Sequence, residues 1–121
     1  MGQINLLTDK NQIVTNSPTQ SVICSFQTNY NSRGHFIVKV RAVAMNDHIA
    51  KAWILSARYS RTNNSIPEIS TLTYTLVDGD ALSSSWDIAI MPSVDGLISI
   101  QCLGSLVETA WIGEFDAVET H

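Results

Sequence analysis

The chain has 121 residues, of which 45% are hydrophobic and only 15% are charged. This length suits one domain with a single core, and the hydrophobic content excludes an intrinsically disordered chain. The formal net charge of −4 and the lack of a basic run argue against a nucleic-acid-binding surface. The apolar stretches are too short for a membrane-spanning helix, and the first residues lack the pattern of a secretion signal.

Apolar and polar residues alternate with a period of two along most of the chain, which indicates β-strands. A short lead strand is predicted at 11–16 and a longer strand at 20–28. The core-facing side of the second strand is predicted to carry Val22, Cys24 and Phe26.

The clearest alternation lies in the run 34–46, where one face is wholly apolar and the other mixes charges with aliphatic side chains. The turn residues Asn46 and Asp47 separate it from a second alternating run at 48–60. Two long strands joined by a short turn predict an antiparallel hairpin. The apolar face of the first strand carries Phe36, Val38, Val40, Ala42 and Ala44, and one face of the second carries Ile49, Trp53, Leu55, Ala57 and Tyr59.

Four more strands are predicted after the polar loop 61–68. Their predicted ranges are 69–77, 85–91, 98–102 and 107–116, with a tight turn at Gly104-Ser105 between the last two. In the first of these, Leu72, Tyr74 and Leu76 share one face, and threonines 71, 73 and 75 occupy the other, which suits an exposed surface.

Seven strands and a lead strand, with no helical period, predict an all-β fold. We expect an antiparallel β-sandwich, jelly-roll-like, of about seven or eight strands. The strand order stays open between jelly-roll and immunoglobulin-like connections.

The large aromatic residues are interpreted as core, because each tryptophan shares its strand face with aliphatic side chains. The alternative is a lectin-like role, in which exposed aromatic rings bind sugars. The predicted core aromatics are Trp53, Trp86, Trp111, Phe36 and Tyr74. The two cysteines, Cys24 and Cys102, are too few for a disulfide scaffold or a zinc site, and two buried free thiols are preferred over one bridge.

Residues that could support catalysis have simpler interpretations. His35, His48 and His121 are read as solvated histidines at strand edges. The acidic residues Asp78, Asp80 and Asp87 are interpreted as residues that favour a turn, and the alternative is a calcium site. No catalytic, cofactor or metal residue is assigned, and an enzyme is not expected. The rival hypothesis is a hydrolase whose site uses His48 or the carboxylates near the C-terminus.

Those carboxylates, together with basic residues of the central hairpin, are candidates for charges at a subunit interface. The basic residues are Lys39, Arg41 and Lys51, and the acidic residues are Glu108, Glu114 and Asp116, with Glu119 close by in the chain.

Three segments in a fixed order carry a resemblance to a known class. They are 86–90 (WDIAI), 96–104 (GLISIQCLG) and 108–111 (ETAW), the last followed by alternating Gly113, Phe115 and Ala117. With the hairpin before them, this layout over 20–118 resembles small β-sandwich virion proteins of tailed bacteriophages, which include capsid decoration (cement) proteins and tail-fibre modules. Cys102 departs from the pattern.

The resemblance implies a non-enzymatic structural protein of the virion, assembled in the host cytoplasm. The expected role is a homotrimeric capsid decoration protein whose partners are its own copies and the major capsid protein or other virion proteins. The alternative is a tail-fibre or baseplate receptor-binding module for host surface glycans. No cofactor, nucleic acid or membrane is expected. Residues 1–17 would form an N-terminal arm ahead of a single β-sandwich domain at 18–121.

Overall fold

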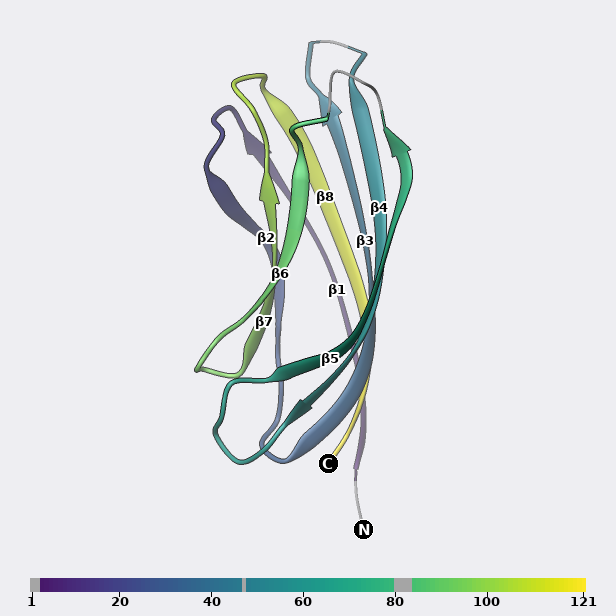
Figure 1. Cartoon of the computed structure of the whole chain (residues 1–121), viewed down its shortest axis with the longest axis vertical. Coiled ribbons are helices and arrows are strands. Elements are labelled where there is room, and N and C mark those ends of the chain that lie inside the picture. The colour runs from purple at the N-terminus through teal and green to yellow at the C-terminus, as the bar shows by residue number, and fades with distance from the viewer. Residues whose placement is uncertain (1–2, 47, 80–83) are drawn as a thin grey trace.

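Two antiparallel sheets face each other in the computed structural model, which describes residues 3–46, 48–79 and 84–121 (Figure 1). The strands are β1 (Ile4–Thr15), β2 (Gln20–Gln27), β3 (Ser32–Ala44), β4 (Ala50–Arg61), β5 (Glu68–Gly79), β6 (Asp87–Pro92), β7 (Leu97–Leu103) and β8 (Thr109–Thr120). The order is β1-β8-β3-β4-β5 in the five-stranded sheet and β2-β7-β6 in the three-stranded sheet. The predicted all-β sandwich is confirmed. Within the described ranges, no helix is long and apolar enough to cross a membrane.

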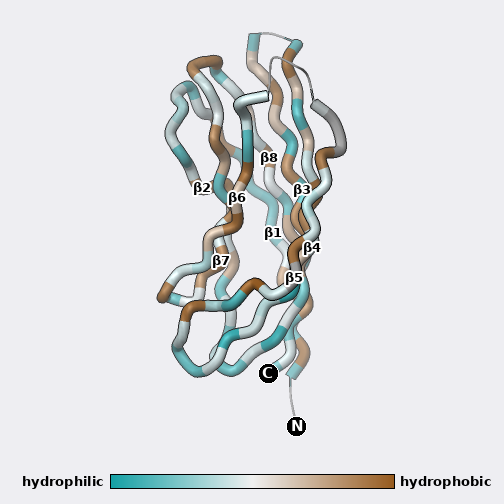
Figure 2. The backbone as a smooth tube through the Cα atoms, in the orientation of Figure 1, coloured by the Kyte–Doolittle hydropathy of each residue, from teal (hydrophilic) through white to brown (hydrophobic). Residues whose placement is uncertain are grey.

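The β3–β4 hairpin forms the centre of the larger sheet, as its alternating pattern predicts. Val38 lies opposite Leu55, and Val40 lies opposite Trp53. On its other side β3 pairs with β8, where Val38 meets Phe115. Brown and teal positions alternate along these strands in Figure 2, because successive side chains point to opposite faces. The predicted turn residue Asp47 lies outside the described residues.

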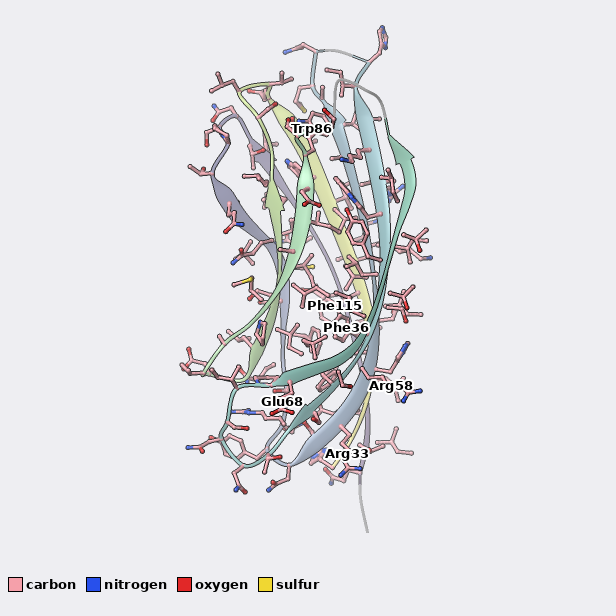
Figure 3. The ribbon with its side chains drawn as sticks, in the orientation of Figure 1. Arg33, Phe36, Arg58, Glu68, Trp86 and Phe115 are labelled. Atoms are coloured by element: carbon pink, nitrogen blue, oxygen red, sulfur yellow. The ribbon has the colours of Figure 1, made fainter. Side chains whose placement is uncertain are left out.

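The core between the sheets is built from aromatic rings. The rings of Trp53 and Trp111 stack with centroids 5.9 Å apart and planes 12° apart, and Trp86 contacts Trp111 at 5.9 Å. Further along the sandwich, Phe26 of the smaller sheet contacts Phe36, Tyr59 and Phe115 of the larger one. Figure 3 shows Phe36 and Phe115 between the two layers. The contacts of Trp86 and Phe26 join the two layers, since such aromatic pairs add to the energy of burial.

The pairing of the strands nearest the two ends of the chain is that of a jelly roll, whereas the pairing of the strands in the middle of the chain is not. Strand β1 pairs with β8 and β2 pairs with β7, as in a rolled-up eight-stranded chain. The hairpins β3–β4 and β6–β7, however, each stay within one sheet, which makes the sheets unequal. The expected tight turn at Gly104-Ser105 is also wrong, because β7 and β8 belong to different sheets and this segment crosses between them.

The predicted face of β2 is wrong at Val22, which is 47% exposed. The register with β7 shifts between Val22 and Cys24, which marks a β-bulge. The extra residue brings Ile23 into the core beside Cys24, and Phe26 keeps its predicted place.

The expectation that Tyr74 is a core aromatic is also wrong. Leu72 and Leu76 are both 52% exposed, and Tyr74 is 45% exposed. They lie opposite Ala57, Leu55 and Trp53, so they share the inner face of the larger sheet. The three-stranded sheet is too narrow to cover all five strands, and the edge strand β5 is left open. The described threonines on the opposite face, Thr73 and Thr75, are exposed as expected.

The first residues differ from the expected arm. Residues 4–15 form β1, which pairs along its whole length with β8, from Ile4 opposite Thr120 to Thr15 opposite Thr109. The lead strand predicted at 11–16 is therefore part of a longer strand. Trp111 ties it to the core, since its Nε1 donates to Thr15 Oγ1 at 2.9 Å.

Both cysteines are buried free thiols, as preferred from the sequence. Burial raises the pKa of Cys24 and of Cys102 to about 11, with a further contribution from the charge of Asp9 at Cys24. We expect neither thiol to react with iodoacetamide at pH 8 within an hour, because the thiolate is the nucleophile and neither thiol is accessible. Mass spectrometry should find two labels only after unfolding, and rapid labelling of the native protein would contradict this placement.

Candidate functional site

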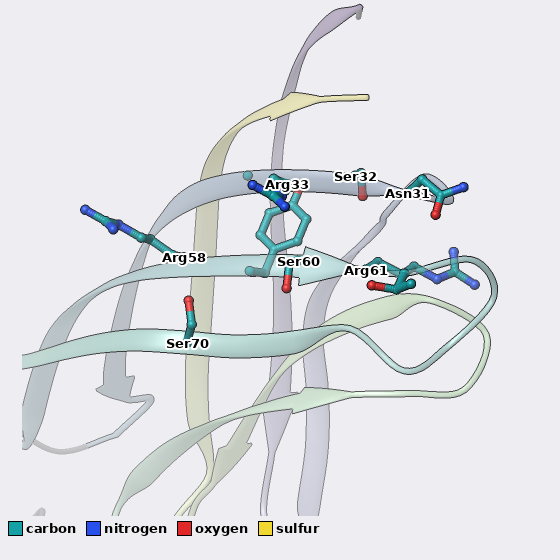
Figure 4. Close-up of a pocket in the computed structure, with 10 residues that line it drawn as sticks. Asn31, Ser32, Arg33, Arg58, Ser60, Arg61 and Ser70 are labelled. Carbon is teal, nitrogen blue, oxygen red and sulfur yellow. The ribbon is translucent and has the colours of Figure 1, made fainter.

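A surface hollow with a volume of about 510 Å³ lies where β3, β4 and β5 run side by side (Figure 4). It is lined by Asn31, Ser32, Arg33, Gly34, Arg58, Tyr59, Ser60, Arg61, Thr62 and Ser70. The lining is rich in hydroxyl and guanidinium groups, which are the groups that bind polar ligands.

Strand alternation brings Arg33 and Arg58 to this hollow. Even-numbered residues of β3 and odd-numbered residues of β4 face the core, which turns both arginines outward. Since Arg33 lies opposite Ser60 and His35 lies opposite Arg58, the two arginines are diagonal neighbours on the outer face. Figures 3 and 4 show the Arg58 side chain extending away from the sandwich.

Neither arginine has a carboxylate partner among the described residues. The two ion pairs there join Glu114 to Lys10 at 3.8 Å and to Arg41 at 3.3 Å. Glu68 lies opposite Ser60 and is exposed, yet it makes no ion pair with either arginine and does not line the hollow. Within the described residues, the guanidinium groups of Arg33 and Arg58 are therefore not engaged in ion pairs.

The floor of the hollow is held by a buried polar network. The Tyr59 hydroxyl donates to Glu119 Oε2 at 2.5 Å, and Glu119 is fully buried. The other carboxylate oxygen accepts from the backbone and side-chain nitrogens of Asn29 at 3.1 and 2.7 Å. Burial, followed by the hydrogen bond to Glu119 and the charge of that residue, raises the pKa of Tyr59. The Tyr59 hydroxyl therefore retains its proton and donates it in the hydrogen bond to Glu119.

A third arginine, Arg61, points inward and supports the loops behind the hollow. Its Nη1 donates to the Thr28 carbonyl and its Nε to the Ser65 carbonyl, both at 3.0 Å. The guanidinium lies over the Tyr30 ring, 4.6 Å from its centre. Because Arg61 is buried and bonded to these carbonyls, it positions the loops. The two exposed arginines, Arg33 and Arg58, are the groups available to a ligand.

Gly34 allows the Tyr59 ring to lie flat in this floor. A Cβ at position 34 would overlap the ring, which the hydrogen bond to Glu119 holds in place. We expect Gly34→Ala to lower the free energy of unfolding by about 1 to 3 kcal/mol, as for other overpacked sites. The matched control is Gly79→Ala, where the nearest atom would be Lys51 Cγ at 3.4 Å. Urea denaturation compares the two, and equal effects would contradict the argument.

The predicted tryptophans, Trp53, Trp86 and Trp111, are buried in the core, as is Phe36. A lectin-like site built on exposed tryptophans therefore has no support in this structure.

The predicted interface charges lie in several places. Glu114 holds Arg41 and Lys10 on the outer face of the larger sheet. Lys51 donates from Nζ to the Trp86 carbonyl at 2.7 Å and lies over the Trp53 ring, which makes it part of the fold. The remaining three, Lys39, Glu108 and Asp116, are exposed.

Among the described residues considered for catalysis, His35, His121 and Asp87 have separate hydrogen-bond partners. His35 shares a hydrogen bond with Ser56 at 2.9 Å, and His121 pairs through its backbone with Gln3. Asp87 Oδ1 accepts from the Tyr74 hydroxyl at 3.1 Å. Within 3–46, 48–79 and 84–121, no group of three or more His, Cys, Asp or Glu residues could hold a metal ion. Of the proposed calcium residues, Asp80 and the side chain of Asp78 lie outside the description.

Sequence reasoning missed the pair Arg33 and Arg58. Arg58 lies at an outward position of the predicted hairpin, and Arg33 lies one residue before its first strand with the parity of that strand's outward residues. This parity was the available signal. Their proximity depends on the register between β3 and β4, which a turn of uncertain length does not define.

Comparisons with known proteins bear on the fold alone. No protein-family profile matches the chain, and no curated protein does. Among solved structures, 97% of the chain aligns with the tailspike protein gp49 of Acinetobacter baumannii bacteriophage Fri1, a capsular polysaccharide depolymerase, with a TM-score of 0.51 and 11% identity. It also aligns over 97% with the tailspike protein of Acinetobacter baumannii phage AM24, with a TM-score of 0.53 and 12% identity. The aligned parts are 17% and 26% of those chains, so the likeness is to one portion of a tailspike.

Proposed function

We propose that this chain is a β-sandwich module of a phage tail spike or fibre and that it recognises glycans on the host surface. The observation that carries the proposal is the polar, arginine-containing hollow on a fold shared with portions of two phage tailspikes. A polysaccharide presents many hydroxyl groups, and the lining offers serine, asparagine and arginine partners for them.

The proposed activity is binding rather than hydrolysis. Glycoside hydrolysis by the usual mechanism needs two carboxylates on either side of the scissile bond. The residues that line the hollow include no Asp or Glu. One neighbour is described as a depolymerase, but the aligned part is 17% of that chain.

A tail location is favoured over the capsid-decoration role expected from the sequence, because both structural neighbours are tailspike proteins.

The homotrimer remains part of the proposal. The open inner face of β5, with Leu72, Tyr74 and Leu76, supports it, since assembly would cover these side chains. Light scattering after size exclusion should give three times the mass of one chain, and a stable monomer at micromolar concentration would contradict the trimer.

The test is binding of the purified chain to an array of bacterial surface polysaccharides, followed by biolayer interferometry. We expect saturable binding to at least one polysaccharide, with no release of reducing ends on prolonged incubation. Absence of binding across the array would contradict glycan recognition, and release of reducing ends would contradict a non-enzymatic module.

The tail location is tested by electron microscopy of the intact phage particle with a gold-labelled antibody against this chain. We expect the label on the tail, and labelling of the capsid shell would contradict the location.

A further inference from the structure

We propose that the hollow selects acidic glycans, and that Arg33 and Arg58 hold the carboxylate or phosphate group of a sugar. This inference rests on the proposed function and adds the chemical class of the ligand. Its structural basis is a pair of outward arginines, diagonal neighbours across β3 and β4, that line a hollow of about 510 Å³.

The charge of this site is available to a ligand. On the same outer face, Arg41 is paired with Glu114, whereas Arg33 and Arg58 have no ion-pair partner among the described residues. A guanidinium group presents a planar fork of N–H donors that matches the two oxygens of a carboxylate or phosphate. Two such forks on the same outer face of neighbouring strands favour an anionic group over a neutral one.

Hydroxyl groups beside the arginines suit the rest of a sugar ring. Ser60 and Ser70 line the hollow, and each can donate and accept one hydrogen bond or more. Asn31 closes one end, with a positive φ of 54° and its Oδ1 accepting from the Asn63 backbone nitrogen at 2.9 Å. The anion and the neighbouring hydroxyls of one sugar thus have separate partners.

Two side chains that line the hollow are held by hydrogen bonds within the protein. Tyr59 is anchored to the buried Glu119, and Arg61 is anchored to two carbonyls. A ligand therefore does not have to order these two side chains, which reduces the entropic cost of binding.

A second hollow suggests that the ligand is longer than one sugar. It has a volume of about 380 Å³, is lined by residues that include Tyr30 and Asp95, and shares Arg61 with the first. Tyr30 is 64% exposed, which leaves ring surface open for a further sugar. An oligosaccharide with its acidic group at Arg33 and Arg58 and a neutral sugar beside Asp95 fits this arrangement better than a free monosaccharide.

The experiment uses isothermal titration with three probes: a uronic-acid oligosaccharide, the same oligosaccharide with its carboxyl groups reduced to alcohols, and a glycerol-phosphate oligomer. We expect binding of an anionic probe and at least tenfold weaker binding of the reduced one. Binding of the uronate or of the phosphate probe identifies which oxyanion is used. Affinity should fall as salt increases, because the site is exposed.

The variants are Arg33→Gln and Arg58→Gln, each expected to weaken binding about tenfold or more, since hydrogen bonds to charged groups are the stronger ones. Arg41→Gln is the matched control on the same face and should bind like the wild type, and Glu68→Gln should bind slightly more tightly. Circular dichroism verifies that every variant is folded.

The two proposals fail in different ways. Equal binding of the acidic and the reduced oligosaccharide would overturn the acidic preference and leave glycan recognition intact. Equal losses in Arg33→Gln and Arg41→Gln would overturn the location of the site. If no polysaccharide of the array and no probe binds, both proposals are wrong.

Discussion

Replacement of Trp111 by alanine is expected to lower the free energy of unfolding by about 3 to 5 kcal/mol, the usual range for a large buried aromatic residue. Trp111 is fully buried, stacks on Trp53 and contacts Trp86 from the opposite side of the core. Its indole nitrogen also holds Thr15 of β1. The substitution therefore removes a contact between the sheets and one that fixes the edge strand.

Urea denaturation followed by circular dichroism measures this effect. Leu106→Ala is the matched control, because Leu106 is 80% exposed and its loss should change stability by less than about 0.5 kcal/mol. The loss of unfolding free energy in Trp111→Phe should lie between those of the other two variants, since the phenyl ring still packs in the core but cannot donate to Thr15. A loss below about 1 kcal/mol for Trp111→Ala would contradict the central place of this residue in the core.

The second large effect is expected at the buried network of Tyr59 and Glu119. Tyr59→Phe should cost about 2 kcal/mol, because it leaves a buried carboxylate oxygen without its donor. Glu119→Ala should cost about 4 kcal/mol, since it opens a cavity and leaves the Tyr59 hydroxyl and the donors of Asn29 unpaired. A double-mutant cycle should show coupling above about 1 kcal/mol between the two positions. Additive losses would contradict a direct interaction.

The same network predicts a pH dependence. The pKa of Tyr59 is raised above its ordinary value of 10.0, so the folded protein retains a proton that the unfolded chain releases. The stability linked to this proton is complete below pH 10 and decreases as pH rises above that value. Unfolding measured between pH 8 and 11 should therefore show a steeper alkaline loss in the wild type than in Tyr59→Phe. Identical profiles would contradict the assignment.

Much of the fold follows from alternation in the sequence. The face from Phe36 to Ala44 is buried because a strand that packs on a core places one of its two faces inward, and this face is wholly apolar. The parity of β8 likewise places Trp111 and Phe115 inward. The same parity puts Glu119 inward, although it is close in the chain to the carboxylates proposed as interface charges. Its burial depends on Tyr59 and Asn29, which approach from distant parts of the chain.

Other features depend on information that the two-residue alternation of apolar and polar side chains does not contain. The bulge at Ile23 inserts one residue without a glycine or proline to mark it. The exposure of Tyr74 depends on the width of the opposite sheet, which is a property of strand order rather than of β5 itself. The hollow at Arg33 and Arg58 depends on strand register. Periodicity defines which face a residue occupies, and topology defines what covers that face.

The central claim is that the outer face at the β3–β4 end binds an acidic glycan. It is tested most directly by nuclear magnetic resonance, in which the ¹⁵N-labelled chain is titrated with the oligosaccharide that binds most tightly. We predict that the shifted amide signals gather at Arg33, Gly34, Arg58, Ser60 and Ser70. Shifts centred instead on the open face of β5, around Leu72 and Leu76, with none at the arginines, would contradict the claim.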